Sequence, residues 1–192
     1  FYLAASPDYV RIRKEIGEYV INSYAPKKMV DGSQMALDVA SAALTLFSEK
    51  YAPYPYTEFD IVSTPTYALG IEYPGMTAIN PDLYDLTAEL YGTNAAVYLE
   101  STVAHEVGHQ WFYNLVGNDQ LDEPWLDESL TQYITWQYYL ESYGESGGAN
   151  FEYSLNQRWE RLDKETIPRG MPVGNYQSGA YSAIIYGRGA FF

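Results

Sequence analysis

Two histidines and a glutamate stand at a spacing that suits a metal site in the segment His105-Glu106-Val107-Gly108-His109. The segment lies in an apolar stretch with helical periodicity, and residues four apart stack on one face of a helix. Both imidazoles can therefore reach one tetrahedral Zn²⁺. Glu106 lies about a quarter-turn round the same helix, where it can act on a water molecule without binding the metal. The spacing predicts a zinc site with a general base beside it.

A zinc site of this kind needs at least one more protein ligand. The chain holds only two histidines and no cysteine. Glu128, in Trp125-Leu126-Asp127-Glu128-Ser129, is the next good candidate, because the eighteen residues after His109 let one helix end and a second return alongside. The alternative to a metal site is a purely structural role. The two histidines would then be buried and hydrogen-bonded, and Glu128 would be an acid in the first turn of a helix, where the helix dipole favours it. The complete pattern favours one Zn²⁺ per chain.

Composition and charge narrow the class of protein. The 192 residues suit one domain, and 47% hydrophobic with 19% charged residues is typical of a globular fold. The net charge of −14 disfavours nucleic acid and anionic membranes as partners. No membrane-spanning apolar run occurs in the sequence. The cellular compartment cannot be deduced, because cysteine is absent.

The order of the expected elements predicts an α+β fold that is strand-rich over about 1–80 and helical over about 93–192. Residue alternation predicts a hairpin within 1–24 that turns near Gly17, a strand at 59–62, and a candidate edge strand at 67–72. The segment His105–His109 is called the metal box below. A first helix is expected at 34–51, capped by Ser33, and a second runs from Thr93 or Asn94 through the metal box to 116–119. Further helices are expected at 124–143, where Gly144 ends the helix, at 151–162, and from 178 onward. Residues 145–148 suggest a linker and 166–177 a loop.

Four motifs carry a resemblance to a known family. The pattern H-E-x-x-H, eighteen residues, then Glu resembles the gluzincin peptidases, and W-L-D-E-S at 125–129 is similar to the W-L-N-E-G of zinc aminopeptidases of the aminopeptidase N and leukotriene hydrolase type. Y-G-R-G-A at 186–190 resembles that family's Y-x-K-G-A, with Tyr181 five residues before Tyr186. L-G-I-E-Y at 69–73 falls where the family has G-x-M-E-N.

The resemblance implies a thermolysin-like catalytic domain over 1–192, a fragment of a longer protein whose remaining domains would be its partners. It implies a zinc metallopeptidase in which Glu106 is the general base and Tyr186 stabilises the oxyanion. The metal would be held by His105, His109 and Glu128. The chain begins at Phe1 and stops at Phe192 in mid-pattern, which fits an excised piece.

The same resemblance implies an aminopeptidase. Glu72 would pair with the free α-ammonium of a peptide substrate, and Gly70 and Tyr181 would also contact the substrate. Since Leu69, Ile71 and Tyr73 depart from the family pattern, an endopeptidase or another zinc hydrolase on the same core remains an alternative. A catalytically inactive interaction module is a second alternative, although it would be expected to lose parts of the box.

The ligand assignment generates a direct test of metal content. Elemental analysis of the purified protein should find about one zinc per chain, and His109→Ala or Glu128→Ala should lose it, because each removes a ligand. Glu106→Gln, which is similar in shape and removes no ligand, should retain zinc and serves as the matched control. Full retention of zinc in both Ala variants would contradict the assignment.

Overall fold

The computed structural model describes residues 2–160, 162, 168, 170–177 and 179–191. It divides into two compact units, Phe1–Gln110 and Trp111–Phe192. The first carries a small mixed sheet and the second is helical, so the predicted α+β class is confirmed. No helix among the described residues is long and apolar enough to cross a membrane.

The sheet of the first unit has five strands in the order β1-β2-β3-β5-β4. The strands are β1 (Tyr9–Ile16), β2 (Tyr19–Pro26), β3 (Glu58–Ser63), β4 (Gly70–Tyr73) and β5 (Met76–Ile79). β1 and β2 form the predicted hairpin, with Gly17 at φ +56°, a conformation that favours glycine. β3 runs parallel to β2 and β5, while β4 pairs antiparallel with β5.

The edge position predicted for the strand at 67–72 is confirmed, but β4 begins later, at Gly70. Its partner β5 was not predicted. The four residues of β5 are short for a strand, and β5 is joined to β4 by only Pro74 and Gly75. A second, two-stranded sheet pairs β6 (Glu89–Leu90) with β7 (Thr93–Asn94) just before the helix that carries the metal box.

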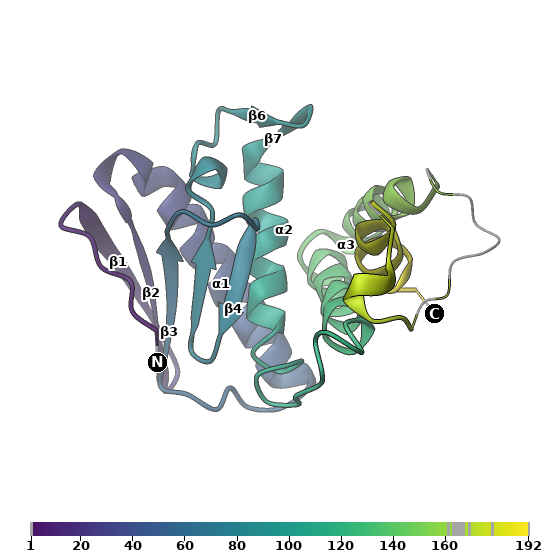
Figure 1. Cartoon of the computed structure of the whole chain (residues 1–192). Coiled ribbons are helices and arrows are strands. Elements are labelled where there is room, and N and C mark those ends of the chain that lie inside the picture. The colour runs from purple at the N-terminus through teal and green to yellow at the C-terminus, as the bar shows by residue number, and fades with distance from the viewer. Residues whose placement is uncertain (1, 161, 163–167, 169, 178, 192) are drawn as a thin grey trace. The chain divides into compact units, whose positions relative to one another are not determined.

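Helices α1 (Val30–Lys50) and α2 (Ala95–Gly108) lie on one face of the five-stranded sheet (Figure 1). Their apolar sides and the sheet form the core, whose fully buried side chains include Leu44, Phe47, Phe59, Ile61 and Leu99. Short 3₁₀ turns, η1 (Lys27–Met29) and η2 (Pro81–Tyr84), precede α1 and follow β5. This arrangement places α2 against β4 and β5, at the end of the sheet where the edge strand lies.

Two predicted helix boundaries are wrong. Ser33 does not cap the first helix, which begins at Val30; its buried hydroxyl lies inside the helix, 2.7 Å from the hydroxyl of Ser23. The helix with the metal box ends at Gly108 and not at 116–119, and the C-terminal cap is His109 itself. The apolar residues after His109 continue the helical pattern in the sequence but form turns in the structure.

The second unit is built from a long, bent helix and two π-helical segments. These are η3 (Trp125–Ser129), α3 (Leu130–Glu160) and η5 (Ser182–Arg188), with a 3₁₀ turn η4 (Val173–Asn175) between the last two. The break predicted at Gly144 is confirmed by its φ of +68° and ψ of −164°. The linker predicted at 145–148 is wrong, since helix resumes at once.

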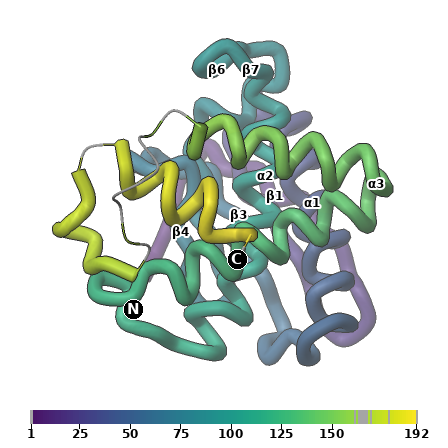
Figure 2. Tube along the Cα trace, turned by 90° about the vertical axis from the view of Figure 1, so that its right-hand side faces the viewer, coloured from purple at the N-terminus to yellow at the C-terminus, as the bar shows by residue number. Residues whose placement is uncertain are grey.

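The two runs of α3 pack against each other. Tyr139 and Phe151 stack with ring centroids 4.7 Å apart, whereas twelve residues of straight helix would separate them by about 18 Å. Figure 2 shows the chain reversing between these runs. The helix predicted at 151–162 is present to Glu160. Parts of the predicted loop at 166–177 and the first residue of the predicted last helix, 178, lie outside the described residues.

Candidate metal centre

Helix α2 is fixed at its start by Asn94, one of the two capping residues that the sequence leaves open. The side chain of Asn94 accepts a hydrogen bond from the backbone N–H of Ala96 at 2.8 Å. Leu99, Val103 and Val107 are fully buried along the same helix. Because these contacts fix the rotation of α2, the polar residues near its end are held inside the protein.

The two histidines converge on one point. Their Nε2 atoms lie 3.0 Å apart, and the rings meet edge to face with centroids 4.7 Å apart. Two Zn–N bonds of about 2.0–2.1 Å at a tetrahedral angle separate the nitrogens by roughly 3.3 Å. His105 and His109, which are 9% and 1% exposed, therefore fit a zinc ion with little movement.

Two carboxylates stand beside this pair. Ligand atoms of Glu72, Glu106 and His109 all lie within 4.8 Å of one another. Glu106 is 5% exposed and comes from α2, whereas Glu72 comes from the edge strand β4. The first unit alone thus brings together four of the predicted site residues, the two histidines and these two carboxylates.

Gly70, which the sequence places in the substrate-binding segment, lies against the side chain of Glu106. A Cβ at Gly70 would lie 2.6 Å from Cγ and 2.7 Å from Cδ of Glu106, too close for any side chain. The edge strand can approach α2 this closely because the residue is glycine. Any larger residue at position 70 would therefore push the Glu106 carboxylate out of its present position.

The remaining predicted residues gather in the second unit. Glu128 lies on η3, and its neighbour Ser129 donates a hydrogen bond from Oγ to the carbonyl of Ile185 on η5 at 2.9 Å. Gly189 packs so closely on Ser129 that an added Cβ would clash with it. η3 and η5 are therefore locked together, which holds Glu128 near the segment that carries Tyr186.

Tyr181 and Tyr186 lie next to each other in this cluster, with ring centroids 5.8 Å apart and edge to face. Burial raises the pKa of Tyr181, the Glu128 carboxylate raises it further, and a hydrogen bond with Tyr186 opposes the shift. A tyrosine phenol is protonated at neutral pH even at its ordinary pKa of about 10, so Tyr181 can donate a hydrogen bond. Glu128 and the two tyrosines thus share one environment.

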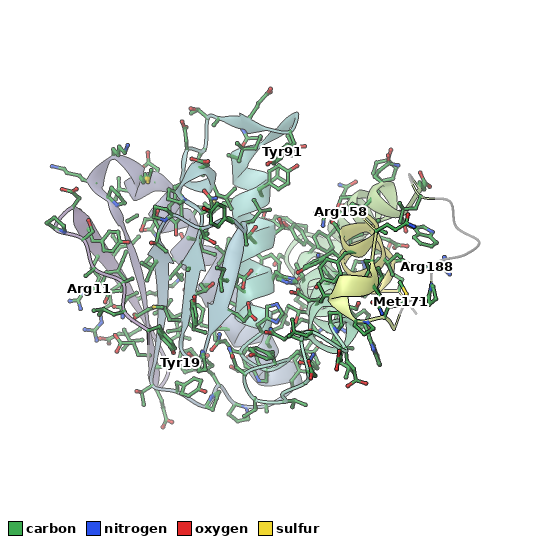
Figure 3. All side chains as sticks on the ribbon, in the orientation of Figure 1. Arg11, Tyr19, Tyr91, Arg158, Met171 and Arg188 are labelled. Atoms are coloured by element: carbon green, nitrogen blue, oxygen red, sulfur yellow. The ribbon has the colours of Figure 1, made fainter. Side chains whose placement is uncertain are left out.

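Arg188, labelled in Figure 3, stands where the family has lysine. Its guanidinium lies over the ring of Trp159, 4.5 Å from the ring centroid. This cation–π contact joins the end of η5 to the end of α3. Arginine stacks on an aromatic face better than lysine does, and this contact with Trp159 accounts for arginine at position 188 where the family has lysine.

Two amides that no sequence motif marks also support the cluster. Asp127 is 1% exposed, and its carboxylate accepts hydrogen bonds from Asn118 Nδ2 at 3.1 Å and Gln120 Nε2 at 3.0 Å. The turn before η3 is thereby tied to the residue preceding Glu128. The loop holding these amides has no periodicity, so the sequence gives no signal for them.

Comparison with known proteins matches most of this chain to one peptidase family. Residues 35–192 match the model of the Peptidase family M1 domain. Among similar proteins, Aminopeptidase M1 of Arabidopsis thaliana is 33% identical over 140 residues, which is 69% of this chain and 15% of that protein. Aminopeptidase M1-B of Oryza sativa subsp. japonica is 36% identical over 107 residues, 54% of this chain and 12% of that protein.

A longer match covers more of the chain at lower identity. Endoplasmic reticulum aminopeptidase 2 of Bos taurus is 26% identical over 180 residues, 88% of this chain and 18% of that protein. The aligned region therefore spans only 12% to 18% of the length of these three relatives. The resemblance found in the motifs is confirmed at the level of the family.

The Asp127 contacts generate a prediction about stability. Asn118→Ala removes a hydrogen bond to a buried carboxylate and should lower the free energy of unfolding by about 1.5–3 kcal/mol, measured by chemical denaturation. Asn118→Asp should cost more, because it puts a second carboxylate against Asp127. The exposed change Asp122→Asn is the control and should be nearly neutral. An unchanged stability in both Asn118 variants would contradict this account.

Proposed function

The chain belongs to peptidase family M1, and from this premise we propose that it is the catalytic part of a zinc aminopeptidase. The observation that carries the proposal is the close grouping of Glu72 and Glu106 with His109, whose Nε2 is 3.0 Å from that of His105. Its substrates are peptides with a free N-terminus. The other domains of the full-length protein are its remaining partners.

We assign His105, His109 and Glu128 as the zinc ligands. The 3.0 Å separation of the two Nε2 atoms supports the first two, and the family spacing of eighteen residues supports Glu128. Two imidazoles and one carboxylate form a common ligand set of catalytic zinc. When bound, zinc supplies a Lewis acid that lowers the pKa of water and polarises the scissile carbonyl.

Glu106 is the general base. As the oxygen of water bonds to the carbonyl carbon, the carboxylate takes a proton from that water, and it returns this proton to the leaving nitrogen when the C–N bond breaks. Glu106 is 5% exposed, so little bulk water competes with the reacting water for its carboxylate. The contact with Gly70 limits where the carboxylate can lie.

Tyr186 stabilises the oxyanion of the tetrahedral intermediate by donating its phenol proton in a hydrogen bond. Its position on η5, which Ser129 ties to the segment of Glu128, supports this role. Tyr181 is the protonated neighbour of Tyr186 and contacts the substrate.

Glu72 binds the substrate's α-ammonium and so makes the enzyme an exopeptidase. Its position on the edge strand, close to Glu106, supports this role, because the amine then lies one residue from the bond that is cleaved. A charge-assisted contact between carboxylate and ammonium is strong enough to select for a free N-terminus.

The alternatives are less favoured. The relatives described above all carry the name aminopeptidase, which argues against the endopeptidase interpretation. An inactive interaction module would be expected to lose parts of the motif, whereas His105, Glu106 and His109 are all present and buried.

The oxyanion role predicts a specific kinetic signature. In the full-length enzyme, Tyr186→Phe should lower kcat on the order of 10²–10³-fold with little change in KM, because the lost bond strengthens only in the transition state. Tyr181→Phe, which removes the neighbouring phenol hydroxyl, is the matched control and should have the smaller effect on kcat. A rise in KM alone for Tyr186→Phe would make Tyr186 a binding residue.

The amine-binding role is tested by substrate choice. The full-length protein should cleave a free-amine aminoacyl substrate on the order of 10²–10³-fold faster than its acetylated form, because a carboxylate deprived of its charged partner in a closed site costs about 2–5 kcal/mol. Glu72→Ala should shrink this ratio and retain zinc, and Glu72→Asp should shrink it less. Equal wild-type rates on both substrates would support an endopeptidase instead.

A further inference from the structure

Gln110 directly follows the metal box and is fully buried. Its side-chain amide makes two hydrogen bonds to backbone atoms that lie more than thirty residues earlier in the chain. Nε2 donates to the carbonyl of Tyr73 at 3.0 Å, and Oε1 accepts from the N–H of Gly75 at 2.9 Å. Only this orientation of the amide satisfies both partners, because a carbonyl cannot donate and an N–H cannot accept.

Both partners belong to the tight turn between β4 and β5. Tyr73 pairs with Met76, so Pro74 and Gly75 are the two central residues of the turn. Proline followed by a residue at φ +77° is the pattern of a type II turn. Types I and II fit the twist of a hairpin poorly and tend to splay its strands. Contacts from outside the hairpin can therefore stabilise this turn, and Gln110 makes two of them, to Tyr73 and to Gly75.

The hairpin needs that support because of where it lies. β4 is the edge strand, and among the described residues β5 is its only neighbour in the sheet. Glu72 is the residue before Tyr73, and Gly70 is two residues earlier. The amide of Gln110 therefore ties the strand that carries Glu72 to the end of α2, one residue after His109. Tyr2 also contacts this turn, through a hydrogen bond to the Pro74 carbonyl, but it is 40% exposed.

We propose that Gln110 is a positioning residue that fixes Glu72 relative to the metal box and thereby sets the selection of substrates with a free amine. This inference rests on the proposed role of Glu72. The two hydrogen bonds from one planar amide hold the turn at Tyr73 and at Gly75, on either side of Pro74. Without them the β4–β5 hairpin can shift or tilt relative to α2, and the Glu72 carboxylate moves away from the point where the α-ammonium must sit.

The test compares two substrates in the full-length, zinc-loaded protein. Gln110→Met keeps the length and apolar volume of the side chain and removes both hydrogen bonds. KM for the free-amine substrate should rise about tenfold, while kcat/KM for the acetylated substrate stays near the wild-type value. The preference for the free amine should thus fall about tenfold with zinc retained. A merely structural role would reduce the active fraction and lower both rates equally.

A matched control lies in the same hairpin. Thr77 is fully buried on β5, and its hydroxyl donates to the carbonyl of Ile71 at 3.1 Å. Thr77→Val removes this bond with little change of shape and leaves the tie to α2 intact. It should preserve the preference for the free amine within about twofold. A loss as large as that of Gln110→Met would show that any weakening of the hairpin suffices, and would overturn the specific role of Gln110.

A second readout does not depend on activity. Amide hydrogen exchange should show the N–H of Gly75 protected in the wild type and at least about tenfold faster in Gln110→Met, with the N–H of Asp60, which bonds to the Gly75 carbonyl, much less affected. If Gln110→Met does not fold, Gln110→Glu serves instead, since it keeps an acceptor for Gly75 and loses the donor to Tyr73.

The outcomes separate the inference from the function on which it rests. Wild-type discrimination that persists in a Gln110 variant, or unchanged exchange at Gly75 in Gln110→Met, would overturn the inference and leave the aminopeptidase proposal intact. Equal wild-type rates on the two substrates would overturn the proposed role of Glu72 and the inference with it. A reduced ratio together with faster exchange at Gly75 would support both.

Discussion

The structure depends on one demanding placement, that of two imidazole nitrogens 3.0 Å apart at the buried end of a helix. Histidines four residues apart supply the spacing, but the helix must also stop at the second one so that a strand can reach the same point. α2 meets both conditions by ending at Gly108, with His109 as its cap. Burying such polar groups lowers stability unless partners or a metal compensate. The neighbouring elements are therefore arranged around that point.

Close approach of the backbone is the second constraint, and it follows from the first. The carboxylates of Glu72 and Glu106 come from a strand and a helix, and they can share one site only if β4 lies almost against α2. Gly70 allows this contact, and Gln110 holds the turn beyond it. In the second unit, Ser129 and Gly189 do the comparable task of locking η3 to η5 beside Glu128 and Tyr186. Small residues and buried amides thus position the proposed site residues.

The sequence predicts the local signals well. The hairpin at Gly17, the cap at Asn94 and the break at Gly144 each depend on a residue type whose conformational preference is strong. Boundaries governed by tertiary contacts are predicted poorly. Ser33 has the chemistry of a cap but bonds to Ser23, and the apolar residues after His109 keep a helical pattern where the chain turns. Gln110 carries no sequence signal at all, because its partners lie more than thirty residues away and are backbone atoms.

X-ray absorption spectroscopy at the zinc edge of the full-length protein tests the central claim most directly. The account predicts a four-coordinate ion with two imidazole ligands, seen as nitrogen at about 2.0–2.1 Å with the outer-shell scattering of two rings, and oxygen donors in the remaining places. Glu128→Ala should leave the two-imidazole signal of any metal that still binds. A spectrum with one imidazole or none, or a six-oxygen shell, would contradict the assignment of His105 and His109 as the pair around which this domain is built.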